Sequence, residues 1–114
     1  MKISLALKRH RCLIPADGFY EWKKTGPKEK PAYNFGLATG SVFAFAGLWD
    51  WWRDPKKNTL ETCTILTTRP NPLVADVHDR MPAIRDPDDY EGWLDPGITN
   101  SEIVLDFLNL LMPA

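Results

Sequence analysis

From residue 11 onward, short apolar runs and runs of alternating hydrophobic and polar residues predict β-structure. Residues 11–14 (RCLI) have the apolar, β-branched character of a strand. The stretch 15–18 (PADG) has the proline and Asp-Gly chemistry of a turn, and residues 19–24 alternate again, as a second strand does. Residues 25–31 are polar and contain two prolines, so we expect an exposed hairpin loop there.

The middle of the chain repeats this pattern with longer apolar runs. Residues 33–37 and 42–49 are expected to form a second strand pair, joined by the short connection 38–41. Residues 51–58 are charged and are expected to form a loop. The run 60–68 is the strongest strand candidate of the chain, because β-branched residues are concentrated in it.

Two short helices are predicted before residue 80. Residues 1–10 (MKISLALKRH) form one amphipathic segment, typical of the last turns of a helix. Residues 70–77 suit a short helix with a proline at its start, where the missing amide proton removes no hydrogen bond.

Two further helices are predicted in the last third. Asp86 can cap a helix whose first position is Pro87, and the acidic residues that follow favour the positive end of its dipole. The stretch 94–97 (LDPG) ends that helix. Thr99 and Glu102 have the spacing of a capping box before an apolar run.

This order of elements predicts an α+β fold, mostly antiparallel β-sheet with short helices. At 114 residues the chain forms one domain with a modest core, and 44% hydrophobic with 25% charged residues is an ordinary composition for a folded protein. No apolar run has membrane-spanning length and no signal-peptide pattern opens the chain. We therefore expect a soluble, cytoplasmic protein.

Charge is unevenly distributed along a chain whose net charge is −1. Residues 1–30 carry eight Lys or Arg and three acids, which gives +5, whereas residues 31–114 carry six and twelve, which gives −6. A basic strip that faces a phosphate backbone explains these counts, and so does an ordinary solvated charged face.

The cysteines and histidines are too few and too scattered to predict a metal site or a cofactor. Cys12 and Cys63 lie in apolar or β-branched runs and are expected to pack as small hydrophobic residues. His10 lies in a basic stretch and is expected to be solvated. With only one other histidine, and no cysteine or carboxylate at ligand spacing, a metal site built by the protein is not expected.

A glutamate within an aromatic strand is the first candidate for chemistry. On a strand, Glu21 shares a face with Phe19 and not with Tyr20 or Trp22. A carboxylate that is partly withdrawn from water among these rings is suited to proton transfer. Periodicity alone favours the simpler alternative, an edge-strand glutamate that points into solvent.

The second candidate is the polar segment 78–82 (HDRMP). His78 is the side chain best suited to exchange protons near neutral pH, and Arg80 offers the planar fork that binds phosphate oxygens. The alternative is structural: Asp79 and Arg80 pair with neighbours while His78 caps the preceding helix. From the residues alone the two interpretations are equally supported.

The segment RCLIPADGFYEW (11–22) resembles the central signature of the SRAP (SOS response-associated peptidase) family. The segments FAFAGLW (43–49) and ETCTILTT (61–68) resemble its next two strands. The segment HDRMP (78–82) resembles its second signature, followed by WLDP (93–96). The resemblance covers most of residues 8–96 in the same order, and it implies an SRAP-type antiparallel sheet or pseudo-barrel, here incomplete.

The resemblance implies a role in the DNA damage (SOS) response. Family members expose an N-terminal cysteine whose amine attacks the aldehyde of an abasic site in single-stranded DNA. Its thiol then closes a thiazolidine, which leaves a covalent protein–DNA linkage. A terminal cysteine carries both groups, so ring closure is intramolecular. The family name reflects a peptidase activity, which removes residues ahead of the cysteine.

The resemblance also assigns roles to residues of this chain. Glu21, His78 and Thr67 match the active-site glutamate, histidine and threonine of the family. Arg80 matches an arginine that contacts DNA phosphate, and Trp22 is expected to help wall the pocket.

Two departures from the family pattern change the expected activity. The family begins Met-Cys-Gly-Arg and contains an Asn-Ala-Arg segment, whereas this chain begins Met-Lys-Ile and has no such segment. The C-terminal strands expected after Leu111 are missing as well. Cys12 offers a thiol but no free amine. We therefore expect a single partial SRAP domain, residues 1–114, that does not crosslink abasic DNA alone.

Two other classes of function stay open. One is a non-catalytic remnant that binds single-stranded DNA through Arg80 and aromatic stacking. The other is a partner-binding domain that pairs with a separately encoded N-terminal SRAP segment through an exposed sheet edge.

Overall fold

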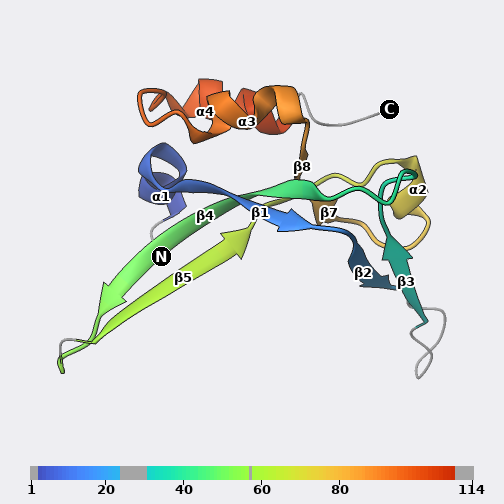
Figure 1. Ribbon diagram of the computed structural model, residues 1–114, viewed down its shortest axis with the longest axis horizontal. Coiled ribbons are helices and arrows are strands. Elements are labelled where there is room, and N and C mark those ends of the chain that lie inside the picture. The colour runs from blue at the N-terminus through green and yellow to red at the C-terminus, as the bar shows by residue number, and fades with distance from the viewer. Residues whose placement is uncertain (1–2, 24–30, 57, 110–114) are drawn as a thin grey trace.

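A computed structural model describes residues 3–23, 31–56 and 58–109, and its largest element is an antiparallel sheet built around one long strand. The strand order is β1 (Arg11–Ala16), β4 (Phe43–Arg53) and β5 (Thr59–Ile65), and β8 (Ile84–Arg85) pairs with the first part of β4. Figure 1 shows β4 and β5 continuing past this sheet as a long projecting hairpin. The fold is thus α+β and mostly antiparallel, as predicted.

Two smaller strand pairs lie beside the main sheet. One is the hairpin of β2 (Phe19–Trp22) and β3 (Ala32–Phe35), and the other joins β6 (Thr67–Thr68) to β7 (Met81–Pro82). Figure 1 places β2, β3 and α2 (Pro72–Ala75) together at the end of the molecule opposite the β4–β5 tip. Within the described ranges these strands remain three separate sheets and do not close into a barrel.

The hydrophobic core lies between the main sheet and a layer of helices. Figure 1 shows α1 (Ile3–Arg9), α3 (Tyr90–Leu94) and α4 (Ser101–Asn109) together on one side of the sheet. A short 3-10 helix, η1 (Pro87–Asp89), leads into α3. The buried residues that form the core cluster come from α1, β4, α3, α4 and the residue between β7 and β8: Ala6, Ala46, Leu48, Ala83, Trp93 and Val104.

Two buried arginines enclose the ring of Trp93, a feature that the sequence did not predict. The guanidinium carbons of Arg11 and Arg85 lie 5.6 and 5.3 Å from the ring centroid. Arg11 donates hydrogen bonds to the carbonyl oxygens of five residues: Leu7, Lys8, Trp93, Asp95 and Ile98. Since those carbonyls come from α1, α3 and the segment after α3, this one side chain fastens the helices to β1.

Burial acts on both arginines in the same direction. It lowers the pKa of Arg11, an effect that the nearby Asp95 partly offsets. Burial also lowers the pKa of Arg85, to about 10, against the opposing effects of Asp89 and Asp86. For both side chains the loss of hydration outweighs the attraction of the nearby carboxylates, yet a guanidinium pKa is high enough that both remain charged at neutral pH.

Several predicted helices are present in the structure. The helix predicted at 1–10 is present as α1, and the one predicted at 70–77 is present as the shorter α2. Asp86 accepts a hydrogen bond from the amide of Asp88, with Pro87 at the first helical position, as predicted. The cap of α4 is Asn100, which accepts from the amide of Glu102, and not the predicted Thr99. The loop predicted at 25–31 lies almost wholly outside the described residues.

The strand pairing predicted for residues 33–49 is wrong. The strand β3 pairs with β2, whereas β4 pairs with β1, β5 and β8. The tight approach at Gly18 explains this, because a Cβ there would lie 2.8 Å from Oδ1 of Asn34 and 2.9 Å from the oxygen of Phe35. Only glycine allows the chain to enter β2 so close to the segment that becomes β3.

The predictions at 51–58 and 60–68 are also wrong in extent. Pairing with β5 carries β4 on to Arg53, so the predicted loop is shorter. The predicted single strand divides at Leu66, where three backbone hydrogen bonds form a ring: Leu66 to Ala46, Ala46 to Ala83 and Ala83 to Leu66. At this ring the pairing of β5 with β4 ends, and β8 pairs with the preceding residues of β4 instead. A residue pattern contains no information about such an exchange of partners.

The projecting hairpin accounts for two further differences. Cys63 is exposed, not buried, because β5 is an edge strand on the part of the sheet that the helices do not cover. His10 is not a freely solvated side chain: its ring stacks on Trp49 at a centroid distance of 4.1 Å.

None of the helices in the described ranges is long and apolar enough to cross a membrane.

The two thiols are expected to differ in reactivity. Burial, and secondarily the neighbouring Cys63, raises the pKa of Cys12, so less reactive thiolate forms at a given pH. We expect iodoacetamide at pH 8 to modify Cys63 at least about tenfold faster than Cys12. Peptide mass spectrometry of timed samples measures both rates, and equal rates in the folded protein would contradict the burial of Cys12.

Candidate functional site

The strand β2 holds Glu21 on its inner face. Burial alternates along this strand, so that Phe19 and Glu21 are partly buried while Tyr20 and Trp22 are exposed. The Glu21 side chain is 19% exposed, which confirms the predicted shared face with Phe19 and excludes the alternative of a fully solvated carboxylate. Pairing with Tyr33 of β3 fixes the backbone at this position.

The segment after α2 holds His78. Asn71 caps α2 by accepting a hydrogen bond from the amide of Val74, and the amide of His78 donates to the carbonyl of Val74. The amide of Asn71 also contacts Sδ of the buried Met81 at 3.1 Å, which brings the two ends of the segment together. These contacts give the histidine a defined position although its side chain is 41% exposed.

Glu21 and His78, distant in sequence, meet in the folded chain. Nε2 of His78 lies 3.8 Å from Oε2 of Glu21. On the other side of the ring, Nδ1 lies 3.2 Å from the amide nitrogen of Arg80 and 3.3 Å from a carboxylate oxygen of Asp79. When the Arg80 amide donates to Nδ1, the neutral ring carries its proton on Nε2, facing Glu21. When Nδ1 carries a proton, it can donate a hydrogen bond to the carbonyl oxygen of Arg80 at 3.2 Å or to the carboxylate of Asp79.

This arrangement can move protons. A carboxylate and an imidazole this close can act as base and acid toward a molecule that binds beside them and contacts both. The alternative prediction, that His78 serves only to cap a helix, does not account for the carboxylate that faces Nε2.

The other predicted site residues are Arg80, Thr67 and Trp22, and they differ in how they lie relative to this pair. Arg80 is exposed and follows His78 by two positions. Thr67 pairs with Pro82 across β6 and β7, which places it beside the end of the same segment. Its hydroxyl forms no hydrogen bond with the pair among the described residues. Trp22 is 54% exposed and lies on the face of β2 opposite Glu21.

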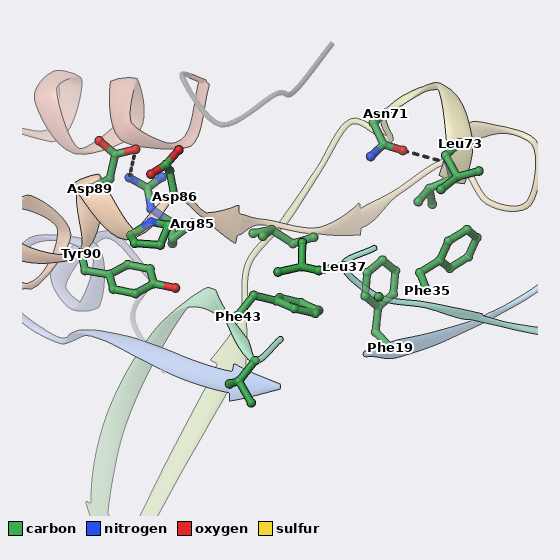
Figure 2. Close-up of a pocket in the computed structure, with 15 residues that line it drawn as sticks. Phe19, Phe35, Leu37, Phe43, Asn71, Leu73, Arg85, Asp86, Asp89 and Tyr90 are labelled. Atoms are coloured by element: carbon green, nitrogen blue, oxygen red, sulfur yellow. Dashed lines mark hydrogen bonds and ion pairs between the residues drawn. The ribbon is translucent and has the colours of Figure 1, made fainter. Parts of the chain in front are cut away.

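An apolar groove adjoins the pair and was not predicted. It has a volume of about 470 Å³, and Figure 2 shows aromatic side chains at one end and acidic side chains at the other. The residues that line it are Phe19, Phe35, Gly36, Leu37, Val42, Phe43, Asn71, Leu73, Val74, Ile84, Arg85, Asp86, Pro87, Asp89 and Tyr90. Phe19 and Val74 connect the groove to Glu21 and His78 respectively. Four separate segments form it, so no single sequence motif indicates it.

The residues that position the site were also missed, although one carried a signal. Asn71 directly precedes a proline, and that pair is typical of a helix cap followed by a first helical position. For Arg11 and Arg85 the sequence contained no such signal, because a buried arginine and a surface arginine look alike in sequence. Across residues 3–23, 31–56 and 58–109, no group of three or more His, Cys, Asp or Glu side chains could hold a metal ion.

The sequence and the fold both match known proteins. A family model described as SOS response associated peptidase (SRAP) matches residues 4–113. The abasic site processing protein YoqW of Bacillus subtilis is 47% identical over 98 residues, which cover 86% of this chain and 44% of YoqW. The abasic site processing protein HMCES of Gallus gallus is 34% identical over 108 residues, which cover 78% of this chain and 32% of HMCES.

Two of the crystal structures that match this chain share its fold. A crystal structure of a Bacteroides thetaiotaomicron protein has a TM-score of 0.80 at 30% identity, and the match covers 90% of this chain and 46% of that one. A Bordetella bronchiseptica protein has a TM-score of 0.78 at 29% identity, with 96% and 53% covered. The chain therefore spans about half the length, or less, of the proteins it matches. With its fold and nearly all of its residues matched, this chain belongs to the SRAP family.

Proposed function

We propose that this protein takes part in the processing of abasic sites in single-stranded DNA, as a partial SRAP domain. The observation that carries the proposal is the approach of Glu21 to His78, at 3.8 Å, beside an exposed arginine. Two further facts support it: the family membership, and the name of relatives such as YoqW. The opened sugar of an abasic site presents an aldehyde, whose reactions with amines need proton transfers at each step.

The pair would supply those proton transfers. The cycle starts with Glu21 ionised and the His78 ring protonated on both nitrogens. Glu21 accepts the proton of the C1′ hydroxyl while Nε2 of His78 donates one to the ring oxygen, which breaks the bond between C1′ and that oxygen and leaves the aldehyde. An amine then attacks C1′ and loses a proton to His78, while the C1′ oxygen takes the proton held by Glu21. His78 next protonates the hydroxyl, which leaves as water, as Glu21 takes the remaining proton of the nitrogen to give the imine. Finally Glu21 returns its proton to the imine nitrogen, the thiol sulfur bonds to the imine carbon and its proton goes to His78, which closes the thiazolidine and restores both groups.

The remaining site residues would hold the DNA. Arg80 is exposed next to His78, where its guanidinium can bind a phosphate of the strand that carries the abasic sugar. Trp22 is exposed on the outer face of the strand that carries Glu21, and an indole there can stack on a neighbouring base. Thr67 lies beside the segment 78–82 and would contact the sugar or the adjacent phosphate.

The amine and the thiol come from outside this chain in the proposal. The backbone nitrogens of Cys12 and Cys63 are amides at internal positions, so neither residue can form a thiazolidine. We infer that a polypeptide stretch of the SRAP fold that bears an N-terminal cysteine completes the site. A second candidate function, non-covalent binding of single-stranded DNA, is favoured by the exposure of Arg80 and Trp22.

Binding of abasic DNA tests the contribution of Arg80. We expect the chain to bind a fluorescein-labelled single-stranded oligonucleotide with one abasic site in about the micromolar range at moderate salt. Loss of one phosphate contact in Arg80→Ala should reduce the slope of log K against log salt by about 0.7. Fluorescence anisotropy at four salt concentrations measures this slope.

Arg53→Ala is the matched control, because Arg53 is an exposed arginine on the projecting hairpin. Its slope should equal that of the unmodified chain. Equal slopes for Arg80→Ala and Arg53→Ala would remove Arg80 from the DNA contact, and absence of binding would contradict both candidate functions.

A further inference from the structure

The apolar groove is lined by hydrophobic side chains that are more exposed than is usual in an isolated domain. Leu73 and Val42 are each 67% exposed and Leu37 is 44% exposed, although all three line one cavity with Phe19 and Phe43. A volume of about 470 Å³ is within the range of clefts that bind ligands, roughly 300–1,000 Å³. A continuous apolar patch of this kind usually marks a binding surface.

The two ends of the groove differ in chemistry, and Figure 2 shows them well separated. At one end Leu73, Phe35 and Phe19 form an apolar wall. At the other end Asp86, Asp89 and the hydroxyl of Tyr90 gather around Arg85, whose guanidinium lies 3.8 Å from the Asp89 carboxylate. Two carboxylates and one guanidinium leave this end net negative. An occupant that matches both ends is elongated, apolar along most of its length and cationic at one end.

The groove lies between separate elements of the fold. On one side is the β2–β3 hairpin, whose Phe19 also makes an edge contact with Phe45 of the main sheet at a centroid distance of 5.9 Å. On the other side are α2 and the segment that leads from β8 into α3. The pair of Glu21 and His78 bridges the same two parts. An occupant that packs on both walls would therefore hold Glu21 against His78.

The lengths of the matched proteins indicate what this occupant is. The Bacteroides structure shares this fold over 90% of the chain, yet the match covers only 46% of that protein. More than half of that protein therefore lies outside the match, and it is the polypeptide that is available to cover the groove. A polypeptide also meets the chemical requirement, since a short extended segment can carry apolar side chains and one Lys or Arg.

We propose that the groove binds an extended, apolar polypeptide segment with a basic residue, which belongs to the part of the SRAP fold outside this chain. The inference rests on the proposed function in one respect, namely that a second polypeptide stretch completes the site. It adds the place where that stretch docks, the charge it carries, and a physical link to Glu21 and His78.

The test uses the 114-residue chain and the stretches of YoqW that the match leaves uncovered, each produced as a separate polypeptide. Isothermal titration calorimetry should detect binding of one stretch. Leu73→Asp places a charge on the apolar wall and should weaken that binding at least about tenfold. Leu60→Asp is the matched control, because Leu60 is 56% exposed on the projecting hairpin, away from the groove. It should leave the affinity unchanged.

A second pair of variants tests the charge. Asp86→Asn removes a carboxylate from the groove while keeping a side-chain oxygen that can cap η1, and it should weaken binding about threefold at low salt. Asp88→Asn, next to it but outside the groove lining, should have no effect. Far-ultraviolet circular dichroism establishes that all four variants are folded.

The outcomes separate this inference from the proposed function. If neither stretch binds, or if Leu73→Asp and Leu60→Asp behave alike, the groove is not the docking site, whatever the DNA result. A small apolar ligand in place of a polypeptide would show as binding of anilinonaphthalene sulfonate that a YoqW stretch cannot displace, and this too would overturn the inference. If the stretch binds the groove and abasic DNA does not bind the chain, the docking inference stands and the proposed function fails.

Discussion

Replacement of Arg11 by methionine is expected to lower the free energy of unfolding by about 3–5 kcal/mol. The guanidinium donates to five backbone carbonyls, including those of Trp93 and Asp95 at 2.6 Å, and is 9% exposed. Methionine fills a similar volume but donates no hydrogen bond, so each of these carbonyls loses one hydrogen bond, and of the two named only that of Asp95 keeps another within the described residues, from the amide of Ile98. A domain of this size has a total stability of about 5–15 kcal/mol, and such a loss leaves it marginal.

Urea titration followed by tryptophan fluorescence measures this change. Arg9→Met is the matched control, because Arg9 is exposed on α1, two positions before Arg11, and its replacement should change stability by less than about 0.5 kcal/mol. Arg11→Lys should fall between the two, since an ammonium donates fewer hydrogen bonds from a shorter reach. Equal midpoints for Arg11→Met and Arg9→Met would show that the five contacts contribute nothing to stability.

Replacement of Glu21 by glutamine is expected to have the largest effect on reactivity. The dipeptide Cys-Gly carries the free amine and thiol that the proposed chemistry requires, so it can stand in for the missing N-terminal cysteine. We expect the chain to accelerate thiazolidine formation between this dipeptide and an abasic single-stranded oligonucleotide. Glutamine keeps the shape of the side chain but cannot accept a proton, and the acceleration should fall by about 10²-fold or more.

Mass spectrometry of the oligonucleotide follows the adduct with time. Glu61→Gln is the matched control, because Glu61 is exposed on β5, and it should react like the unmodified chain. His78→Gln should reduce the rate to a similar extent as Glu21→Gln, with little further loss in the double variant, since the two act as one unit. Equal rates with and without the chain would remove the proton-transfer role from the pair. Without the dipeptide, no band of protein linked to DNA is expected on a denaturing gel.

Some local elements were predicted correctly where a side chain acts on its own backbone, although the cap of α4 is Asn100 and not Thr99. The turn predicted at 15–18 is shorter, because β1 continues to Ala16 and the chain bends at Asp17. The cap formed by Asp86 and the proline that begins α2 depend on neighbours within a few residues. The alternation along β2 likewise predicted which face Glu21 would occupy. Such features involve interactions between residues close in sequence, and these are readable from the order of residue types.

The candidate pair was predicted in part. Sequence motifs pointed to Glu21 and His78 separately, and the family resemblance related them to each other. Their approach to 3.8 Å depends on the β2–β3 hairpin and on the path of the segment between Asn71 and Met81. The order of residue types does not predict the distance between two elements that are far apart in sequence.

The sequence by itself determined the α+β class, the strand faces, most helix starts and the residues capable of proton transfer. Tertiary structure decided the strand partners, the burial of Arg11 and Arg85 around Trp93, the exposure of Cys63 and the apolar groove. The physical reason is the range of the interactions. Caps, turns and alternation arise between residues that are near in sequence, whereas sheet pairing, burial and grooves arise between segments that only folding brings together.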